Sequence, residues 1–200
     1  MNPNIILYFV KYPTPGKVKT RLAKTVGEQE SARLYGELAG KNLEVIASLY
    51  QSNIFDLVIV YDPPEKSEDI KRWLSLSCEY LPQCRGGLSE RLKHAFGEAF
   101  QKGAKRVMAL GSDTLGLTTG IIQQGFEALR SNDVVIGPAE DGGYYLIGLN
   151  SFQPELFQGI TWSTDAVLRQ TYSRIRKLGL SHHRLIQLED LDEIKTGEKV

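Results

Sequence analysis

Cysteine and histidine are scarce in this 200-residue sequence. The two cysteines, Cys78 and Cys84, do not form a Cys-x-x-Cys pair, and the three histidines do not cluster at metal-ligand spacing. These absences exclude a disulfide-stapled scaffold and a structural zinc site, and they fit a reducing compartment. A chain of this length instead buries enough surface for a hydrophobic core, so we expect a single domain over residues 1–200.

An excess of one charge and long hydrophobic runs are also missing. The 24 Lys and Arg residues balance 24 Asp and Glu residues, which removes the bulk attraction behind generic nucleic-acid and anionic-membrane binding. The apolar run near the N-terminus covers only residues 5–10, which is too short for a signal-peptide core or a membrane span. We therefore expect a cytoplasmic protein that binds neither nucleic acid nor membrane.

Short β-rich runs alternate with segments of helical periodicity. The predicted strands are residues 5–10, 55–61, 107–110 and 134–136. None of them alternates with a period of two, so they are expected to be buried on both faces. Apolar residues recur every three or four positions over residues 34–50 and 92–100, which predicts amphipathic helices. This order predicts an α/β fold with a mostly parallel sheet.

The pattern changes in the last third of the chain. Residues 144–149 form another β-rich run that follows residues 134–136 too closely for a crossover helix, so this strand is expected to run antiparallel or to leave the main sheet. Ser163 or Thr164 is expected to cap a helix that ends at Gly179. A last strand is predicted over residues 185–188.

Four cations follow the first predicted strand. They are Lys11, Lys17, Lys19 and Arg21. Ligands of an open parallel sheet bind beyond the carboxyl ends of its strands, so this loop is expected to hold phosphate. Gly16 allows backbone N–H groups to approach a ligand. The loop lacks the spacing of a Walker A motif, and a solvated basic turn is the alternative.

Carboxylates follow two later strands. Asp113, in the turn after residues 107–110, is a candidate ligand for Mg²⁺ or Mn²⁺, or else a turn former or helix cap. After residues 134–136, Glu140 and Asp141 precede the paired glycines Gly142 and Gly143, which suits backbone passing close to an acceptor or sugar. Asp141 is the candidate catalytic base, although Asp-Gly-Gly also suits a hairpin turn.

One aromatic residue is a further candidate. Trp162 lies in a loop before a predicted helix, where its ring can stack on a base or sugar or can pack into the core.

Four segments in this order resemble the glycosyltransferase A superfamily. They are residues 9–22, 111–113, 137–149 and 162–164. The sequence closely resembles the branch of radical-SAM-associated transferases, or arsenosugar-biosynthesis glycosyltransferases, over nearly the whole chain. It is more distantly similar to molybdenum-cofactor guanylyltransferases and 2-phospho-lactate guanylyltransferases, which share the nucleotide-binding half.

The resemblance implies a Rossmann-like three-layer sandwich, whose mostly parallel sheet with an antiparallel strand binds a nucleotide diphosphate. Asp113 is then a metal ligand, Asp192 is a second one, and Asp141 faces the acceptor or sugar. The phosphate-binding residues that it implies are Lys17, Lys19 and Arg21. Residues 86–92 resemble the family's Gly-Asp-Leu-Gly-Glu-Arg-Met run, which makes Arg91 a candidate ligand contact.

Three functions follow as hypotheses. The leading one is a metal-dependent glycosyltransferase that uses a nucleotide-diphosphate sugar and a small-molecule acceptor. The second is a nucleotidyltransferase that transfers a nucleoside monophosphate to a phosphorylated acceptor. The third is a protein that binds nucleotide-sugars without turnover, because Leu115 and Gly116 stand where the family usually has Pro and often has Asp.

Overall fold

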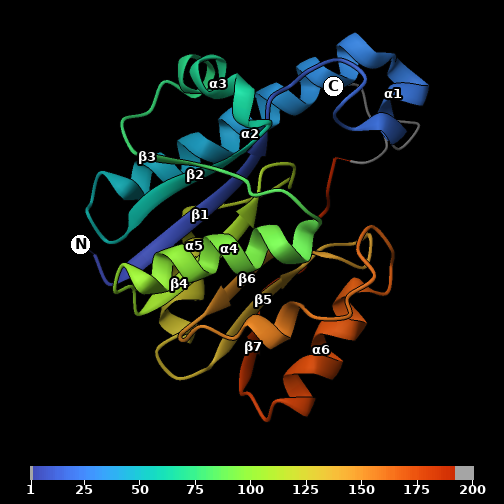
Figure 1. The fold of residues 1–200 in the computed structure, drawn as a ribbon. Coiled ribbons are helices and arrows are strands. Elements are labelled where there is room, and N and C mark those ends of the chain that lie inside the picture. The colour runs from blue at the N-terminus through green and yellow to red at the C-terminus, as the bar shows by residue number, and fades with distance from the viewer. Residues whose placement is uncertain (1, 192–200) are drawn as a thin grey trace.

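The computed structural model describes residues 2–191, which fold into three α/β layers around one sheet (Figure 1). The strands are β1 (Asn4–Lys11), β2 (Asp56–Asp62), β3 (Glu79–Pro82), β4 (Arg106–Gly111), β5 (Val134–Pro138), β6 (Tyr144–Leu149) and β7 (His182–Arg184). The helices are α1 (Thr20–Val26), α2 (Glu28–Tyr50), α3 (Ser67–Leu74), α4 (Leu88–Gln101), α5 (Thr119–Ala128) and α6 (Val167–Lys177), with short 3₁₀ turns at Pro64–Lys66 and Pro154–Phe157.

The sheet has the strand order β3-β2-β1-β4-β6-β5-β7. β1 lies between β2 and β4 and is parallel to both, and β3 and β7 are parallel to their neighbours. β6 is antiparallel to both β4 and β5. The predicted three-layer α/β fold is confirmed, and so is the antiparallel direction of the strand over residues 144–149.

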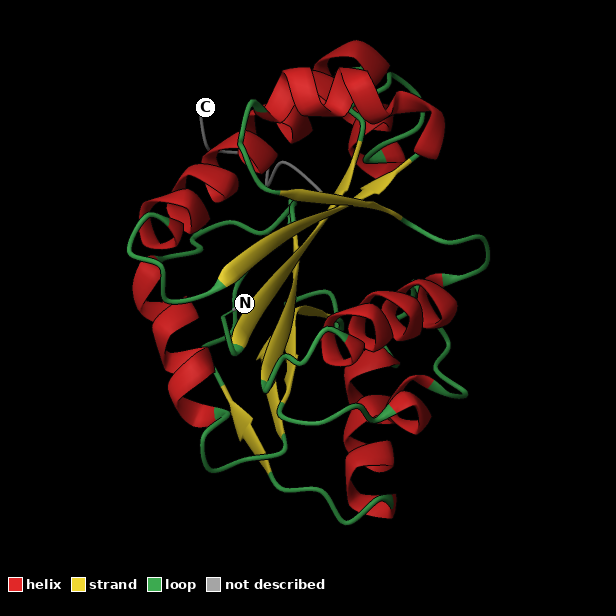
Figure 2. Ribbon diagram, turned by 60° about the vertical axis from the view of Figure 1, so that its left-hand side comes forward, coloured by secondary structure: helices red, strands yellow, loops and turns green. Residues whose placement is uncertain are grey.

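Helices cover both faces of the sheet (Figure 2). Leu43 of α2, Ile70 of α3 and Phe126 of α5 pack on one face, and Phe96 of α4 and Ile175 of α6 pack on the other. Since the central strands are covered on both sides, their side chains are buried in succession, which explains the unbroken apolar runs. Within residues 2–191 no helix combines the length and the apolar character needed to cross a membrane.

Several local predictions differ from the structure. The last strand is β7 at 182–184, not 185–188, where Leu188 forms only an isolated bridge to Ala139. The N-cap of α6 is Ala166 rather than Ser163 or Thr164. Sequence periodicity missed β3 and α3. β3 is a short strand at the sheet edge without a fully buried residue, so it has no apolar run to detect.

Glycine at position 137 sets the spacing between β5 and β6. A Cβ atom there would lie 2.3 Å from the Tyr145 ring. We expect Gly137→Ala to destabilise the protein by about 1–3 kcal/mol, because the ring or the strand must shift. Chemical denaturation measures this change.

Gly40 in helix α2 is the matched control, because a Cβ there meets nothing within 4 Å. Gly40→Ala should instead stabilise by about 1 kcal/mol through helix propensity. Equal effects of the two substitutions would contradict the packing argument.

Candidate active site

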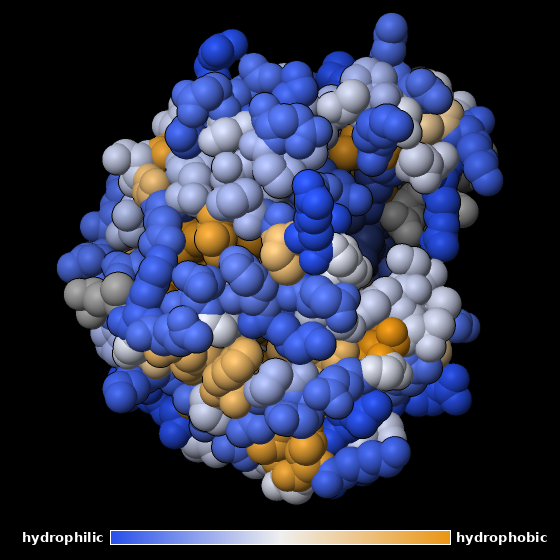
Figure 3. Space-filling view, in the orientation of Figure 1, coloured by the Kyte–Doolittle hydropathy of each residue, from blue (hydrophilic) through white to orange (hydrophobic). Residues whose placement is uncertain are grey.

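A cleft of about 960 Å³ opens at the carboxyl ends of β1 and β4. Figure 3 shows the surface hollowed beside the α1–α2 region, with hydrophilic residues around the hollow. The cleft brings together seven of the predicted site residues. These are Lys11, Lys17, Lys19, Arg21, Arg91, Asp113 and Asp141. The basic loop after the first strand and the acidic turn after the fourth strand therefore face one space.

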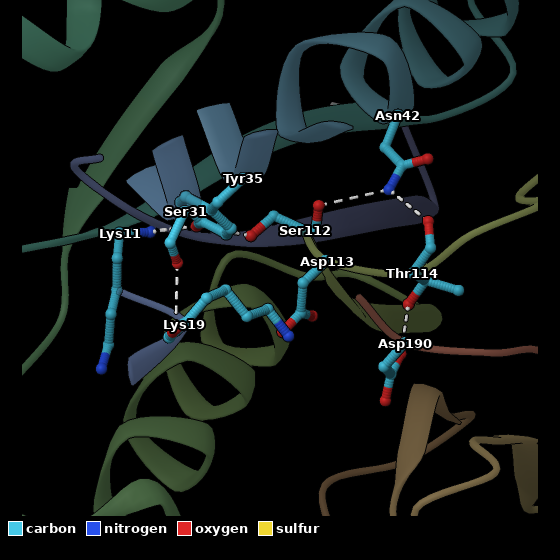
Figure 4. Close-up of polar contacts among 9 residues, drawn as sticks. All are labelled: Lys11, Lys19, Ser31, Tyr35, Asn42, Ser112, Asp113, Thr114 and Asp190. Atoms are coloured by element: carbon cyan, nitrogen blue, oxygen red, sulfur yellow. Dashed lines mark hydrogen bonds and ion pairs between the residues drawn. The ribbon is translucent and has the colours of Figure 1, made fainter. Parts of the chain in front are cut away.

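Lys19 and Asp113 form an ion pair within this cleft (Figure 4). The Lys19 Nζ atom lies 2.6 Å from Asp113 Oδ2, and the two side chains are 8% and 38% exposed. Lys19 has a left-handed backbone, with φ 44°, and its carbonyl accepts a hydrogen bond from Ser31 Oγ at 2.9 Å. Lys19 is thus a buried counter-charge for Asp113, whereas Lys17 and Arg21 are exposed.

Helix α2 holds the turn that carries Asp113. Asn42 is buried, and its amide donates to the carbonyls of Ser112 and Thr114 at 3.2 and 2.8 Å. The Tyr35 hydroxyl accepts the Lys11 N–H at 2.9 Å and pairs with Ser112 Oγ at 2.8 Å. The turn is therefore fixed through its backbone.

Sequence reasoning missed both α2 residues. Burial raises the pKa of Tyr35 to about 12, which keeps its hydroxyl neutral. The available signal was an asparagine on the apolar face of a helix, since Asn42 is adjacent to the core residue Leu43.

Asp190 is a further carboxylate of this site. It accepts a hydrogen bond from Thr114 Oγ1 at 3.2 Å, and residues 114 and 190 form an antiparallel bridge. Burial, followed by the neighbouring charges of Asp113 and Asp141, raises the pKa of Asp190 to about 7. Asp192, the predicted second metal ligand, lies outside the described residues.

The raised pKa of Asp190 gives a testable pH dependence. In the unfolded chain this group titrates at about 3.9, so between about pH 4 and 7 the folded state binds more protons, and stability falls as pH rises. We expect the unfolding free energy of Asp190→Asn to exceed that of the wild type at pH 8, by about 4 kcal/mol, and to match it near pH 4. Denaturation in chelator-containing buffer measures this difference. An equal gain at both pH values would contradict the assignment.

The turn between β5 and β6 presents Asp141 to the cleft. Asp141 Oδ1 accepts the Gly143 N–H at 2.8 Å, so the predicted turn is present. Gly142 has φ 86°, and a Cβ there would lie 2.5 Å from the Asp165 carbonyl oxygen, so only glycine fits. Glu140 is exposed, and it is not among the described residues that line the cleft.

Of the other predicted site residues that the structure describes, Arg91 lines the cleft and Trp162 and the glycines do not. Arg91 lines the cleft, where its Nη1 atom lies 2.8 Å from Gln83 Oε1 and 3.4 Å from Asp62 Oδ2. Trp162 donates its indole N–H to Ser89 Oγ at 2.7 Å and packs edge-on against Tyr144. Gly16 lies against the Glu28 carboxylate. In the described chain, neither Trp162, Gly16, Gly142 nor Gly143 lines the cleft.

The oxygen ligands available in this cleft favour a hard cation that is coordinated jointly by protein carboxylates and by a substrate. Within residues 2–191 no three His, Cys, Asp or Glu side chains form a ready-made metal cage. Asp113 and Asp190 are two neighbouring carboxylates, and burial together with the charge of Asp113 raises the pKa of Asp190. Mg²⁺ is bound by one or two protein carboxylates together with substrate phosphates, so the residues fit such an ion.

This fold, with the cleft at the carboxyl edge of its sheet, is the nucleotide-diphospho-sugar transferase fold. The chain belongs to the DUF2064 family, described as uncharacterized proteins conserved in bacteria, whose sequence profile matches residues 45–164. A search of the curated proteins gave no match.

A solved structure from Desulfovibrio desulfuricans G20, provisionally described as a nucleotide-diphospho-sugar transferase, has 39% sequence identity to this chain. The two structures superpose with a TM-score of 0.90, and the match covers 96% of this chain and 84% of that one.

More distant structures share the fold. The synthetase that makes CMP-2-keto-3-deoxy-manno-octonic acid, solved with CTP, is 12% identical, with a TM-score of 0.53 over 95% of this chain and 93% of that one. Glucosyl-3-phosphoglycerate synthase from Mycobacterium tuberculosis, solved with Mn²⁺ and UDP, is 10% identical to this chain, with a TM-score of 0.52. The match covers 94% of this chain and 70% of that one. The structural neighbours thus include both sugar-transferring and nucleotide-transferring enzymes.

Proposed function

We propose that this protein is a metal-dependent glycosyltransferase that uses a nucleotide-diphosphate sugar as donor and a small molecule as acceptor. The observation that carries the proposal is the Lys19–Asp113 pair, at which basic and acidic walls of one cleft meet. A nucleoside diphosphate needs cations for its phosphates, and its metal ion needs carboxylates. The provisional assignment of the 39% identical relative supports the same class.

The basic wall binds the diphosphate. Lys17 and Arg21 are exposed on it and present an ammonium and a guanidinium group to phosphate oxygens. Lys19 holds Asp113 in place. Asp113 and Asp190 would hold Mg²⁺ or Mn²⁺, which when bound neutralises charge on the leaving diphosphate.

Asp141 acts on the acceptor side. Its carboxylate accepts the proton of the acceptor hydroxyl while the hydroxyl oxygen bonds to the anomeric carbon of the sugar. The bond from that carbon to the diphosphate oxygen breaks, and the nucleoside diphosphate leaves with the electron pair. The motifs at residues 9–22 and 137–149 support the branch of radical-SAM-associated, arsenosugar-type transferases.

Nucleotidyl transfer is the second candidate. In that reaction an acceptor phosphate attacks the α-phosphate of a nucleoside triphosphate, and pyrophosphate leaves. The observation that favours it is the number of cations, because Lys11, Lys17 and Arg21 together match the charge of a triphosphate as well as that of a diphosphate.

A screen of nucleotides and nucleotide-sugars by thermal shift, with and without Mn²⁺, tests the proposal. We expect a nucleotide-sugar to raise the melting temperature, with a larger shift when Mn²⁺ is present. Product analysis then separates the candidates, since glycosyl transfer releases nucleoside diphosphate and nucleotidyl transfer releases pyrophosphate. No response to any nucleotide-sugar would refute the first function.

Removing the two exposed loop cations should weaken nucleotide binding far more than folding. In Lys17→Ala/Arg21→Ala we expect about 100-fold weaker nucleotide binding or more, since each charged hydrogen bond contributes roughly 1.5–3 kcal/mol. The unfolding free energy should change by less than about 1 kcal/mol, because both side chains are exposed. Calorimetric titration and denaturation measure the two quantities.

The matched control is Lys71→Ala/Arg72→Ala, which removes two exposed cations from helix α3. It should leave nucleotide affinity unchanged. Equal affinity in the loop variant and in this control would mean that the loop does not bind phosphate.

A further inference from the structure

A second cleft, of about 600 Å³, lies between helix α6 and the edge strand β7. Arg169 and Arg176 line it from α6, and because they are seven positions apart they share one helix face. His182 and Arg184 line it from β7, where a spacing of two residues places them on one side of the strand. Basic side chains from α6 and from β7 thus line one cleft.

The helix dipole favours Arg176, which lies in the last turn of α6, but it does not account for Arg169. Arg169 is in the first turn of α6, where the helix dipole disfavours positive charge. Within residues 2–191 neither Arg169 nor Arg176 forms an ion pair. Tyr172 also lines the cleft, and its buried hydroxyl has no hydrogen-bond partner in the described part of the chain. The cleft therefore offers positive charge to a ligand.

The second cleft borders the candidate active site. Asp165 lines both clefts, and Gly142 lines the second one while its neighbour Asp141 lines the first. The backbone of Gly142 lies directly against that of Asp165. A molecule anchored in the basic cleft can therefore extend past this turn toward the Asp141 carboxylate.

We propose that the basic cleft binds a phosphate monoester group of the acceptor, an inference that rests on the proposed transferase function. A guanidinium group can donate two parallel hydrogen bonds to a pair of phosphate oxygens. Three arginines therefore suit a doubly charged phosphate better than they suit a singly charged carboxylate. The volume fits a small molecule. The phosphate is an anchor that takes no part in bond making, and it leaves a hydroxyl of the same molecule beside Asp141.

The test titrates inorganic phosphate into the full-length protein by calorimetry at constant ionic strength. The Lys17→Ala/Arg21→Ala background is used, so that binding in the first cleft is weakened. We expect Arg169→Gln/Arg176→Gln to weaken phosphate binding at least tenfold in this background. Arg72→Gln/Arg130→Gln, which removes one exposed arginine of helix α3 and one of the turn after α5, should not change the affinity for phosphate.

Three results would overturn the inference. They are no phosphate binding, equal phosphate affinity in the two arginine variants, and, in a parallel titration of two small organic ligands, glycerate binding as tightly as glycerol 3-phosphate. If circular dichroism shows that Arg169→Gln/Arg176→Gln does not fold, Arg184→Gln on the exposed strand β7 gives the same comparison. The change in phosphate affinity caused by the arginine substitutions reports on this cleft, whereas nucleotide-sugar binding to the wild type reports on the transferase function, so the two failures are distinguishable.

Discussion

Asp113→Asn is expected to abolish metal-stimulated nucleotide binding and to lower turnover by a factor of about 100 or more, while the protein stays folded. The amide keeps the shape of the side chain but removes the charge that would hold a divalent ion. If Asp113 only formed the turn, asparagine would serve nearly as well, and little would change. Asn42 already fixes that turn through backbone carbonyls, so the carboxylate is free for another role.

A moderate loss of stability should accompany this substitution. The buried Lys19 side chain loses its ion pair with Asp113, which costs about 1–3 kcal/mol, less than the usual 5–15 kcal/mol stability of a folded domain. Thermal shift with and without Mn²⁺ separates this loss from loss of metal binding. Asp165→Asn, which changes another carboxylate of the same cleft, is the control and should keep the Mn²⁺ response. Near-wild-type metal-dependent activity in Asp113→Asn would exclude Asp113 as a ligand.

The sequence could place the charged loops at one edge of the sheet, because the strands that precede them were recognisable and parallel. It could not give the burial of Lys19. That burial depends on a left-handed backbone at Lys19 and on Ser31 of helix α2, twelve positions along the chain. The sequence suggested that Lys19 binds phosphate, and it gave no sign that Lys19 pairs with Asp113.

The second carboxylate shows a similar limit. Asp190 contacts the Asp113 turn, whereas Asp192, the expected second metal ligand, lies outside the described residues and stays a prediction. The bridges from residue 114 to 190 and from 139 to 188 set which side chain faces inward. Such long-range pairing is set by tertiary structure, so the local sequence did not indicate that Asp190 meets Thr114.

Trp162 illustrates a choice that residue type alone left open. An aromatic ring in a loop before a helix can stack on a ligand or pack on the protein. Here the Ser89 hydroxyl takes the indole N–H, and Tyr144 packs against the ring. Both partners are distant in sequence, so only the folded chain brings them to Trp162.

Asp141→Asn is expected to lower acceptor-dependent turnover by a factor of about 10²–10⁴, while nucleotide-sugar affinity changes little. Loss of a positioned proton acceptor has an effect of this size. Asparagine can still accept the Gly143 N–H through its side-chain oxygen, so the turn that presents residue 141 is kept. Turnover at saturating donor and donor affinity by calorimetry measure the two effects separately.

Glu140→Gln is the matched control for this experiment, because it neutralises the adjacent carboxylate, which lies outside the described cleft lining. We expect wild-type turnover from it. If Glu140→Gln is slow and Asp141→Asn is not, Glu140 rather than Asp141 is the base. If Asp141→Asn loses donor affinity and the Mn²⁺ response together, Asp141 belongs with Asp113 and Asp190 on the donor side, because its charge already acts on Asp190.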